Sequence, residues 1–229
     1  MTVPKGSYAA GLRRLERPKA ILFDWDNTLI DSWHTIHDAQ NHTMQAFGLE
    51  AWTLEQTRER VRGSMRDSYP EMFGERWQEA GEVFYARFSE RHLDTLTPLP
   101  GAFELLERLA AMEIYMGVVS NKKGDYVRKE AEHLGWSSFF GRIIGAFDAS
   151  RDKPAKEPVD MALTGSGIEA GNTVWFAGDA DIDLHCAINA NCVPILLRET
   201  GPGPHEFVVH PPVLHVNSCK TLLKVVMSL

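Results

Sequence analysis

The chain has 229 residues, of which 44% are hydrophobic and 24% are charged, and its formal net charge is -7. That length supports one sizeable buried core and a small second domain. The acidic balance and the scattered basic residues argue against general nucleic-acid binding, and no apolar run is long enough to cross a membrane.

The three cysteines, Cys186, Cys192 and Cys219, are an odd number without metal-type spacing. A disulfide framework is therefore not expected, and we predict reduced core thiols in a cytoplasmic protein. The sequence leaves the choice between a monomer and a homodimer open.

The first predicted strand ends in two carboxylates separated by one residue. Residues 19–23 have the apolar character of a buried strand, and Asp24 and Asp26 follow directly. Open α/β sheets bind ligands at this end of their strands, where one acid can act as nucleophile while its neighbour handles protons. Asp, Asn and Thr also occur in ordinary turns, so this stretch alone does not decide the function.

The next segment breaks the strand pattern. Residues 32–97 contain no convincing strand and indicate several helices, for example at 33–47 and 79–92. We predict a helical cap at 32–97 and a core made of residues 1–31 and 98–229. A cap that leaves the chain beside the paired carboxylates would lie over them, exclude water and contact the leaving group.

After the cap, short apolar runs alternate with amphipathic helical patterns, which predicts an α/β fold with a Rossmann-like parallel sheet flanked by helices. Besides the first strand at 20–24, the expected strands lie at 114–120, 142–147, 173–178, 193–198 and 214–216. The carboxyl ends of parallel strands meet at one edge of a sheet. Polar residues at these ends are therefore expected to converge.

One such polar residue is Ser120, whose hydroxyl and following backbone N–H groups could bind a phosphoryl oxygen. Asn121 could add an amide donor. A serine at the end of a strand is also a common cap residue. Lys122 and Lys123 are expected to be solvated.

The later polar segments offer a cation and more carboxylates. Lys153 and Lys156 are both candidates for the ammonium that a phosphoryl site needs. Asp179, Asp181 and Asp183 follow the strand at 173–178, and hard oxygen ligands of this kind suit Mg²⁺. Of these acids, Asp181 is expected to be a surface or turn residue.

These four motifs, in this order, resemble those of the haloacid dehalogenase-like hydrolase superfamily, specifically its phosphatase branch with a helical cap, as in phosphoglycolate phosphatases. The resemblance covers nearly all of residues 19–229. It implies a Mg²⁺-dependent phosphate monoester hydrolase that forms an aspartyl-phosphate. Asp24 would be the nucleophile, and Asp26 the general acid and base whose backbone carbonyl also binds the metal.

The resemblance also implies roles for the other motifs. Ser120 stands where the family has a phosphate-binding Ser or Thr, and Lys153 precedes proline as the family's lysine does, which favours it over Lys156. Asp179 would bind Mg²⁺ together with Asp24 and Asp26. Asp183 would support the metal's water shell or the lysine.

Substrate contacts are predicted from the turn after the first strand and from the cap. Thr28 is expected to brace its turn or contact substrate. Gly63 breaks a helix and would leave Arg62 or Arg66 free to reach a substrate carboxylate or second phosphate. A small phosphorylated metabolite such as 2-phosphoglycolate would fit this cationic contact.

Other functions stay open at this stage. A sugar phosphomutase shares the core residues, but residues 33–95 contain no lysine to hold a second phosphate. A phosphatase of broad specificity for sugar phosphates or nucleotides would use the same chemistry. An inactive module that binds a phosphorylated ligand is the alternative outside enzymes, although close-packed acids that repel one another without Mg²⁺ argue against it.

Overall fold

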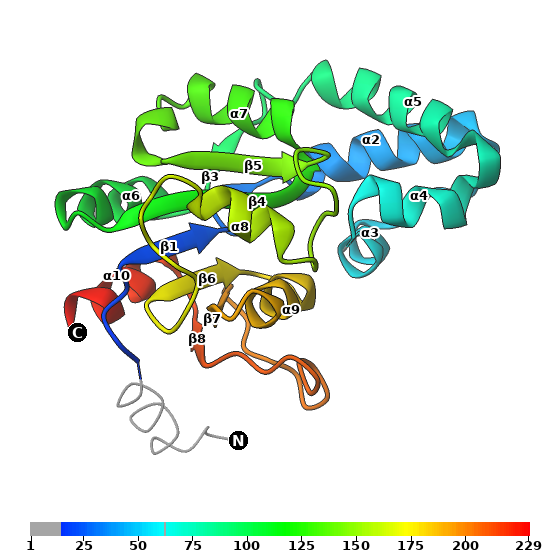
Figure 1. Ribbon diagram of the computed structural model, residues 1–229. Helices are drawn as coiled ribbons and strands as arrows, with labels where there is room; N and C mark the ends of the chain where they lie inside the picture. Colours follow the sequence, from blue (N-terminus) through cyan, green and yellow to red (C-terminus); the bar gives the residue numbers. More distant parts are fainter. Residues whose placement is uncertain (1–14, 62) are drawn as a thin grey trace.

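The computed structural model describes residues 15–61 and 63–229, and its centre is a six-stranded parallel sheet (Figure 1). The strand order is β5-β4-β1-β6-β7-β8. All six predicted strands are present: β1 (Ala20–Phe23), β4 (Tyr115–Lys123), β5 (Arg142–Ala146), β6 (Val174–Gly178), β7 (Val193–Leu197) and β8 (Leu214–Val216).

The topology brings β1 to the middle of the sheet. The chain runs outward from β1 through β4 to β5 and then crosses to β6 on the other side of β1. In the register of the sheet, Phe23 of β1 lies opposite Val118 of β4 and Ala177 of β6. The chain reverses its direction of winding beside β1, and ligands bind at such a switch point in open α/β sheets.

Helices cover both faces of the sheet, as the apolar pattern of β1 requires. Ile21 and Phe23 belong to a core cluster that includes side chains of α6 (Ala102–Ala111), α7 (Gly124–His133) and α10 (Cys219–Met227). Ala20 and Leu22 point to the opposite face, against α8 (Glu157–Leu163) and α9 (Asp181–Asn189). A strand buried on both faces is typical of a parallel sheet.

The helical insert lies between β1 and β4. It leaves and rejoins the core through two short antiparallel strands, β2 (Ile30–Asp31) and β3 (Thr97–Pro98). Its helices are α2 (Trp33–Ala46), α3 (Leu54–Arg60), α4 (Met65–Phe73), the 3₁₀ helix η1 (Gly74–Arg76) and α5 (Trp77–Ser89). The strand arrows of Figure 1 point toward this insert, which we call the cap.

Contacts within the cap explain why its helices form without a sheet. Ile36 and Ala39 of α2 pack against Phe88 of α5, while Thr53 starts α3 with a reciprocal capping box to Gln56. The expected helices at 33–47 and 79–92 correspond to α2 and α5. An apolar seam and satisfied helix ends are what short helices need in order to persist.

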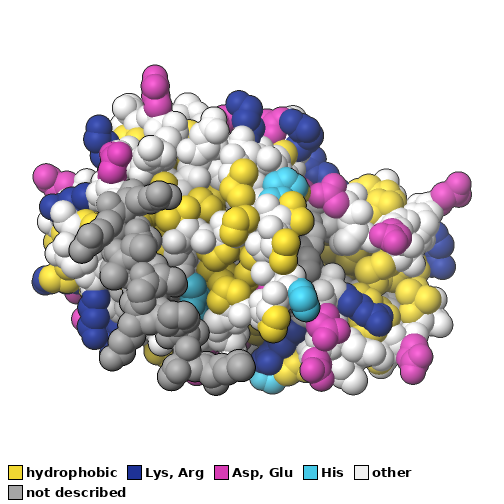
Figure 2. Space-filling view, turned by 90° about the horizontal axis from the view of Figure 1, so that it is seen from below, with side chains coloured by type: hydrophobic (Ala, Val, Ile, Leu, Met, Phe, Trp, Pro, Cys, Tyr) yellow, Lys and Arg dark blue, Asp and Glu magenta, His cyan; other side chains and the backbone are white. Residues whose placement is uncertain are grey.

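The three cysteines are buried and unpaired, as expected. Exposed apolar residues include Val208, Val209 and Val213, all in the loop between β7 and β8. Figure 2, the view from below, shows hydrophobic side chains interspersed with charged ones on that face. Within the described residues, no helix is both long and apolar enough for a membrane span.

The stripe of α6 that faces the core provides a test of the packing. Leu106 is fully buried, whereas its neighbour Glu107 is exposed. We expect Leu106→Ala to lower the free energy of unfolding by about 3 kcal/mol, because it leaves a cavity in the core. Glu107→Ala should change it by less than about 0.5 kcal/mol. Urea unfolding measures both, and a loss below about 1 kcal/mol for Leu106→Ala would contradict the packing.

Candidate active site

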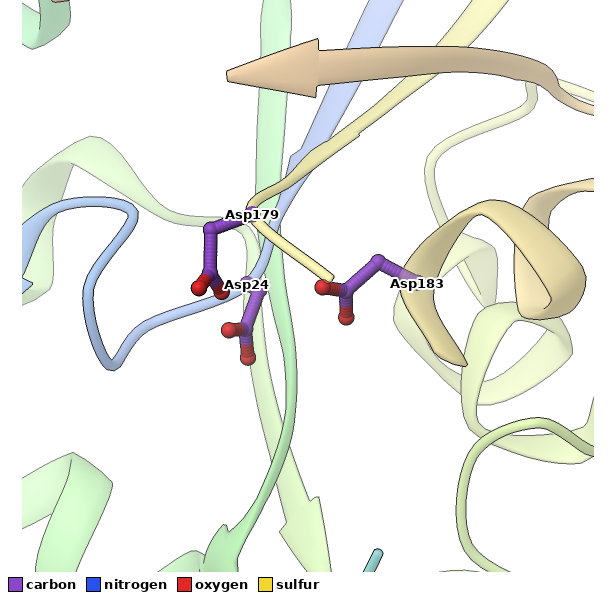
Figure 3. Close-up of side chains that lie close together, drawn as sticks. All are labelled: Asp24, Asp179 and Asp183. Carbon is purple, nitrogen blue, oxygen red and sulfur yellow. The ribbon is translucent and has the colours of Figure 1, made fainter. Parts of the chain in front are cut away.

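Three carboxylates meet at the carboxyl end of the sheet. Asp24 follows β1, Asp179 follows β6, and Asp183 lies in the first turn of α9 (Figure 3). One oxygen from each lies within 4.8 Å of the others. Such a set of hard oxygen donors fits a divalent cation of the Mg²⁺ type.

Lys153 joins two of these carboxylates. Its Nζ lies 2.7 Å from Asp24 Oδ1 and 2.7 Å from Asp183 Oδ1, and the residue is only 2% exposed. Burial opposes its charge, but Asp183 and Asp24 outweigh this effect and raise the pKa of Lys153. By contrast, Lys156 is exposed and pairs with Asp160 on its own helix. Of the two candidate lysines, Lys153 is the one at the carboxylates.

The backbone of Lys153 is held by Asn121. The side-chain amide of Asn121 donates to the Lys153 carbonyl over 3.2 Å, and its oxygen accepts from the Lys153 N–H over 3.0 Å. These two contacts position the lysine. Asn121 also lines the cavity above Asp24, and its predicted contact with phosphate stays a prediction.

The electrostatics of Asp24 fit a group that works beside a cation. Burial raises the pKa of Asp24 to about 7, the neighbouring Asp183 and Asp26 act in the same direction, and Lys153 opposes them. A nucleophilic carboxylate must be ionised, and a divalent cation beside it favours that form. The buried carboxylates are therefore matched to a cation in addition to the lysine.

A second buried charge network surrounds Asp26. Lys122 Nζ lies 2.7 Å from Asp26 Oδ1 and within 3.0 Å of both oxygens of Glu130. The prediction that Lys122 is solvated is wrong, because its side chain is only 6% exposed. Glu130 Oε2 also accepts from the indole N–H of Trp25 at 2.6 Å, and Glu130 Oε1 lies 2.9 Å from His92 Nδ1.

Sequence reasoning missed Lys122, Glu130 and His92, although one of them left a signal. Glu130 lies on the face of α7 that also buries Val127 and Ala131. A charged residue inside such a stripe indicates a buried partner, because an unpaired charge there would be very costly. Nothing local marks His92.

The remaining predicted phosphate contacts differ in their environment. Ser120 is buried within β4 and lines the cavity above Asp24. Its hydroxyl oxygen accepts a hydrogen bond from the Lys122 N–H over 3.2 Å. Thr28 is fully buried and does not line that cavity. Its hydroxyl has no hydrogen-bond partner within the described part of the chain. Thr28 thus lies away from the cavity, and within the described residues its hydroxyl makes no hydrogen bond that would brace the turn.

Comparison with known proteins places this arrangement in a family. The sequence profile of the haloacid dehalogenase-like hydrolases matches residues 21–196. The chain belongs to that family. The resemblance inferred from the motifs, to the phosphatase branch with a helical insert, is confirmed.

Relatives of this haloacid dehalogenase-like hydrolase carry two kinds of name. A phosphoglycolate phosphatase of Aquifex aeolicus is 30% identical over 75% of this chain and 81% of its own length. A pyrophosphatase, PpaX, of Bacillus velezensis is 24% identical over 92% of this chain and 97% of its own. The crystal structure of a predicted phosphatase from Clostridium acetobutylicum, 20% identical, covers 93% of this chain and 100% of its own with a TM-score of 0.82, which shows the shared fold.

Arg66 of this hydrolase does not match the expected free cation. Its Nε and Nη2 donate to the two oxygens of the Asp152 carboxylate, and Nη2 also donates to the Ala149 carbonyl at 3.1 Å. Arg66 is therefore not free to reach a substrate, and it does not line the cavity. Arg62 lies outside the described residues. Arg60 does line the cavity.

The cavity itself has a volume of about 150 Å³ and lies between core and cap. Its core end contains Asp24, Asp179 and Lys153, and its cap end is formed by side chains of α2, α4 and α5. A substrate held here would place one end at the carboxylates and the other against the cap.

The carboxylate cluster predicts stabilisation by Mg²⁺. A cation that binds only the folded state at a concentration of 100 Kd stabilises it by about 2.7 kcal/mol. We expect the thermal midpoint of the chelator-treated protein to rise by roughly 5–10 °C. Asp179→Asn should abolish the rise.

Asp181→Asn is the matched control, since Asp181 is exposed, pairs with His210 and lies two residues after Asp179, in the first turn of α9. It should keep the full response to Mg²⁺. An equal rise in Asp179→Asn would show that the cation binds elsewhere.

Proposed function

We propose that this hydrolase is a Mg²⁺-dependent phosphate monoester hydrolase that works through an aspartyl-phosphate on Asp24. The observation that supports this most directly is the position of Lys153, with its ammonium 2.7 Å from both Asp24 and Asp183 and with Asp179 beside them. This arrangement supports the proposal, because a nucleophile, a fixed cation and metal ligands would all be needed at one end of one cavity.

The first half-reaction transfers the phosphoryl group to the protein. An Asp24 oxygen attacks phosphorus, the bond between phosphorus and the ester oxygen breaks, and Asp26 gives its proton to the departing alkoxide. Ser120 and Lys153 bind the phosphoryl oxygens as charge develops on them. Mg²⁺, held by Asp24, Asp179 and the Asp26 carbonyl with Asp183 in support, would neutralise further charge.

The second half-reaction restores the enzyme. Asp26, now ionised, takes a proton from water, and the resulting hydroxide attacks phosphorus and releases inorganic phosphate from Asp24. Lys122 Nζ lies 2.7 Å from Asp26 Oδ1, whereas Lys153 Nζ lies 2.7 Å from Asp24 Oδ1. The two lysines thus hold two separate carboxylates.

The substrate we propose is a small phosphorylated metabolite in a reducing compartment, the cytoplasm, which the buried unpaired thiols support. The names of the relatives make 2-phosphoglycolate and pyrophosphate the first compounds to assay. Sugar phosphates and nucleotides belong in the same panel, because a phosphomutase or a broad phosphatase would share this core.

The nucleophile gives the first test. We expect Asp24→Asn to lower phosphate release at least 1,000-fold, because an amide cannot form the phosphoryl intermediate. Asp31→Asn is the control, since Asp31 is an exposed acid at the start of the cap, and it should keep activity within about twofold. Released phosphate is measured with Mg²⁺ for both variants, and retained turnover in Asp24→Asn would disprove the mechanism.

The two lysines give the second test. Lys153→Ala should lower kcat at least 100-fold, because it removes the cation that faces the phosphoryl group. Lys156→Ala should have no effect beyond about twofold, because this side chain is exposed. Circular dichroism checks that Lys153→Ala is folded. A folded variant with near-normal kcat would show that Lys153 does not contribute to the proposed reaction.

A further inference from the structure

The two ends of the cavity above Asp24 differ in chemistry. The core end carries the carboxylates and Lys153. The cap end is mainly aromatic, and the rings that line it belong to Trp33, Trp52, Tyr69, Phe84, Tyr85 and Phe88. Aliphatic and thioether side chains of α2 and α4, such as Ile36 and Met72, complete this wall.

Charge is scarce at the cap end. Within the described residues, Arg60 is the only charged side chain that the cap contributes to the lining. It is exposed, and its guanidinium carbon lies 5.1 Å from the centre of the Trp52 ring. Against the aromatic rings of the described cap wall, a carboxylate would lose water without gaining a cation, which is strongly unfavourable. A compact ester that carries a carboxylate as well as a phosphate, such as 2-phosphoglycolate, is a poor match for these rings.

One buried polar group interrupts the apolar wall. Gln40 lines the cavity, is 2% exposed, and accepts a hydrogen bond from the Tyr69 hydroxyl at 3.0 Å through its Oε1. Its Nε2 is buried and has no hydrogen-bond partner among residues 15–61 and 63–229. Buried donors are nearly always paired, so this N–H group indicates an acceptor supplied by a ligand.

We propose that the alcohol part of the substrate is an apolar ring that carries a hydrogen-bond acceptor, with the ring against the aromatic cap wall and the acceptor bound by Gln40. The proposal rests on the phosphate ester hydrolysis proposed above and specifies its substrate class. The ring would occupy the cap end of the cavity, whose whole volume, with the carboxylate end included, is about 150 Å³. Stacked and edge-on contacts between rings would orient the ester over Asp24.

Synthetic esters test the substrate class. With Mg²⁺, kcat/KM is measured for 3-pyridylmethyl phosphate, benzyl phosphate, ethyl phosphate, 2-phosphoglycolate and pyrophosphate, with Asp24→Asn as the blank. Benzyl and ethyl phosphates have leaving alcohols of similar acidity, so their difference reports binding of the ring. We expect benzyl phosphate to exceed ethyl phosphate and 2-phosphoglycolate about 100-fold, and the pyridyl ester, whose ring nitrogen is an acceptor, to exceed benzyl phosphate about tenfold.

The possible failures are distinguishable. If 2-phosphoglycolate, ethyl phosphate or pyrophosphate matches or exceeds benzyl phosphate in an Asp24-dependent reaction, the substrate class is overturned while the phosphatase stands. If no compound releases phosphate in an Asp24-dependent way, the proposed function and this inference both fail.

Variants test the two parts of the pocket separately. The double variant Gln40→Met with Tyr69→Phe removes both partners of the buried hydrogen bond, so neither polar group is left unpaired. It should lower kcat/KM for the pyridyl ester to that for benzyl phosphate and leave benzyl phosphate within about twofold. Trp33→Ala should raise KM about tenfold for both ring esters and leave ethyl phosphate unchanged. An equal loss for all esters in either variant would show a structural role only and overturn the assignment.

Discussion

The arrangement of this active site depends on one buried ammonium group. Lys153 lies between Asp24 and Asp183, and burial without it would leave the two acids to repel each other. Removing one partner of a buried pair leaves an uncompensated charge, which is strongly destabilising. The lysine offsets only part of the negative charge contributed by Asp24, Asp179 and Asp183. The remaining charge of this cluster could be balanced by a divalent cation.

The peptide that carries this lysine also anchors the cap. Asp152, the residue before Lys153, accepts hydrogen bonds from Nε and Nη2 of Arg66 and from the Phe147 N–H. Burial opposes ionisation of Asp152, but these donors outweigh it and lower the pKa of its carboxyl group. The guanidinium carbon of Arg66 also lies 4.8 Å from the centre of the Phe147 ring. Asp152 and Lys153 thus connect one loop of the core to the cap and to Asp24.

The sequence predicted the parts of the molecule that have a local signature. Strands buried on both faces appear as short apolar runs. Asp24 and Asp179 follow such runs directly, and Lys153 stands immediately before a proline. The missed contacts join residues far apart in the chain: Trp25 and Glu130 are separated by 105 positions, and Arg66 and Asp152 by 86. No periodicity marks such pairs. An arginine of the cap therefore gave the same signal whether it bound substrate or the core.

Glu130 shows how such long-range contacts combine around Asp26. Its carboxylate accepts a hydrogen bond from Trp25, in the loop that carries Asp26. It also pairs with Lys122 near the end of β4 and with His92 in the segment that returns from the cap to the core. Burial opposes its ionisation, but Lys122 and the hydrogen bonds of His92 and Trp25 outweigh it and lower the pKa of Glu130. Lys122 also lies 5.0 Å from the centre of the Phe88 ring of α5. Because one carboxylate connects all three segments, the position of Asp26 depends on the cap being seated on the core.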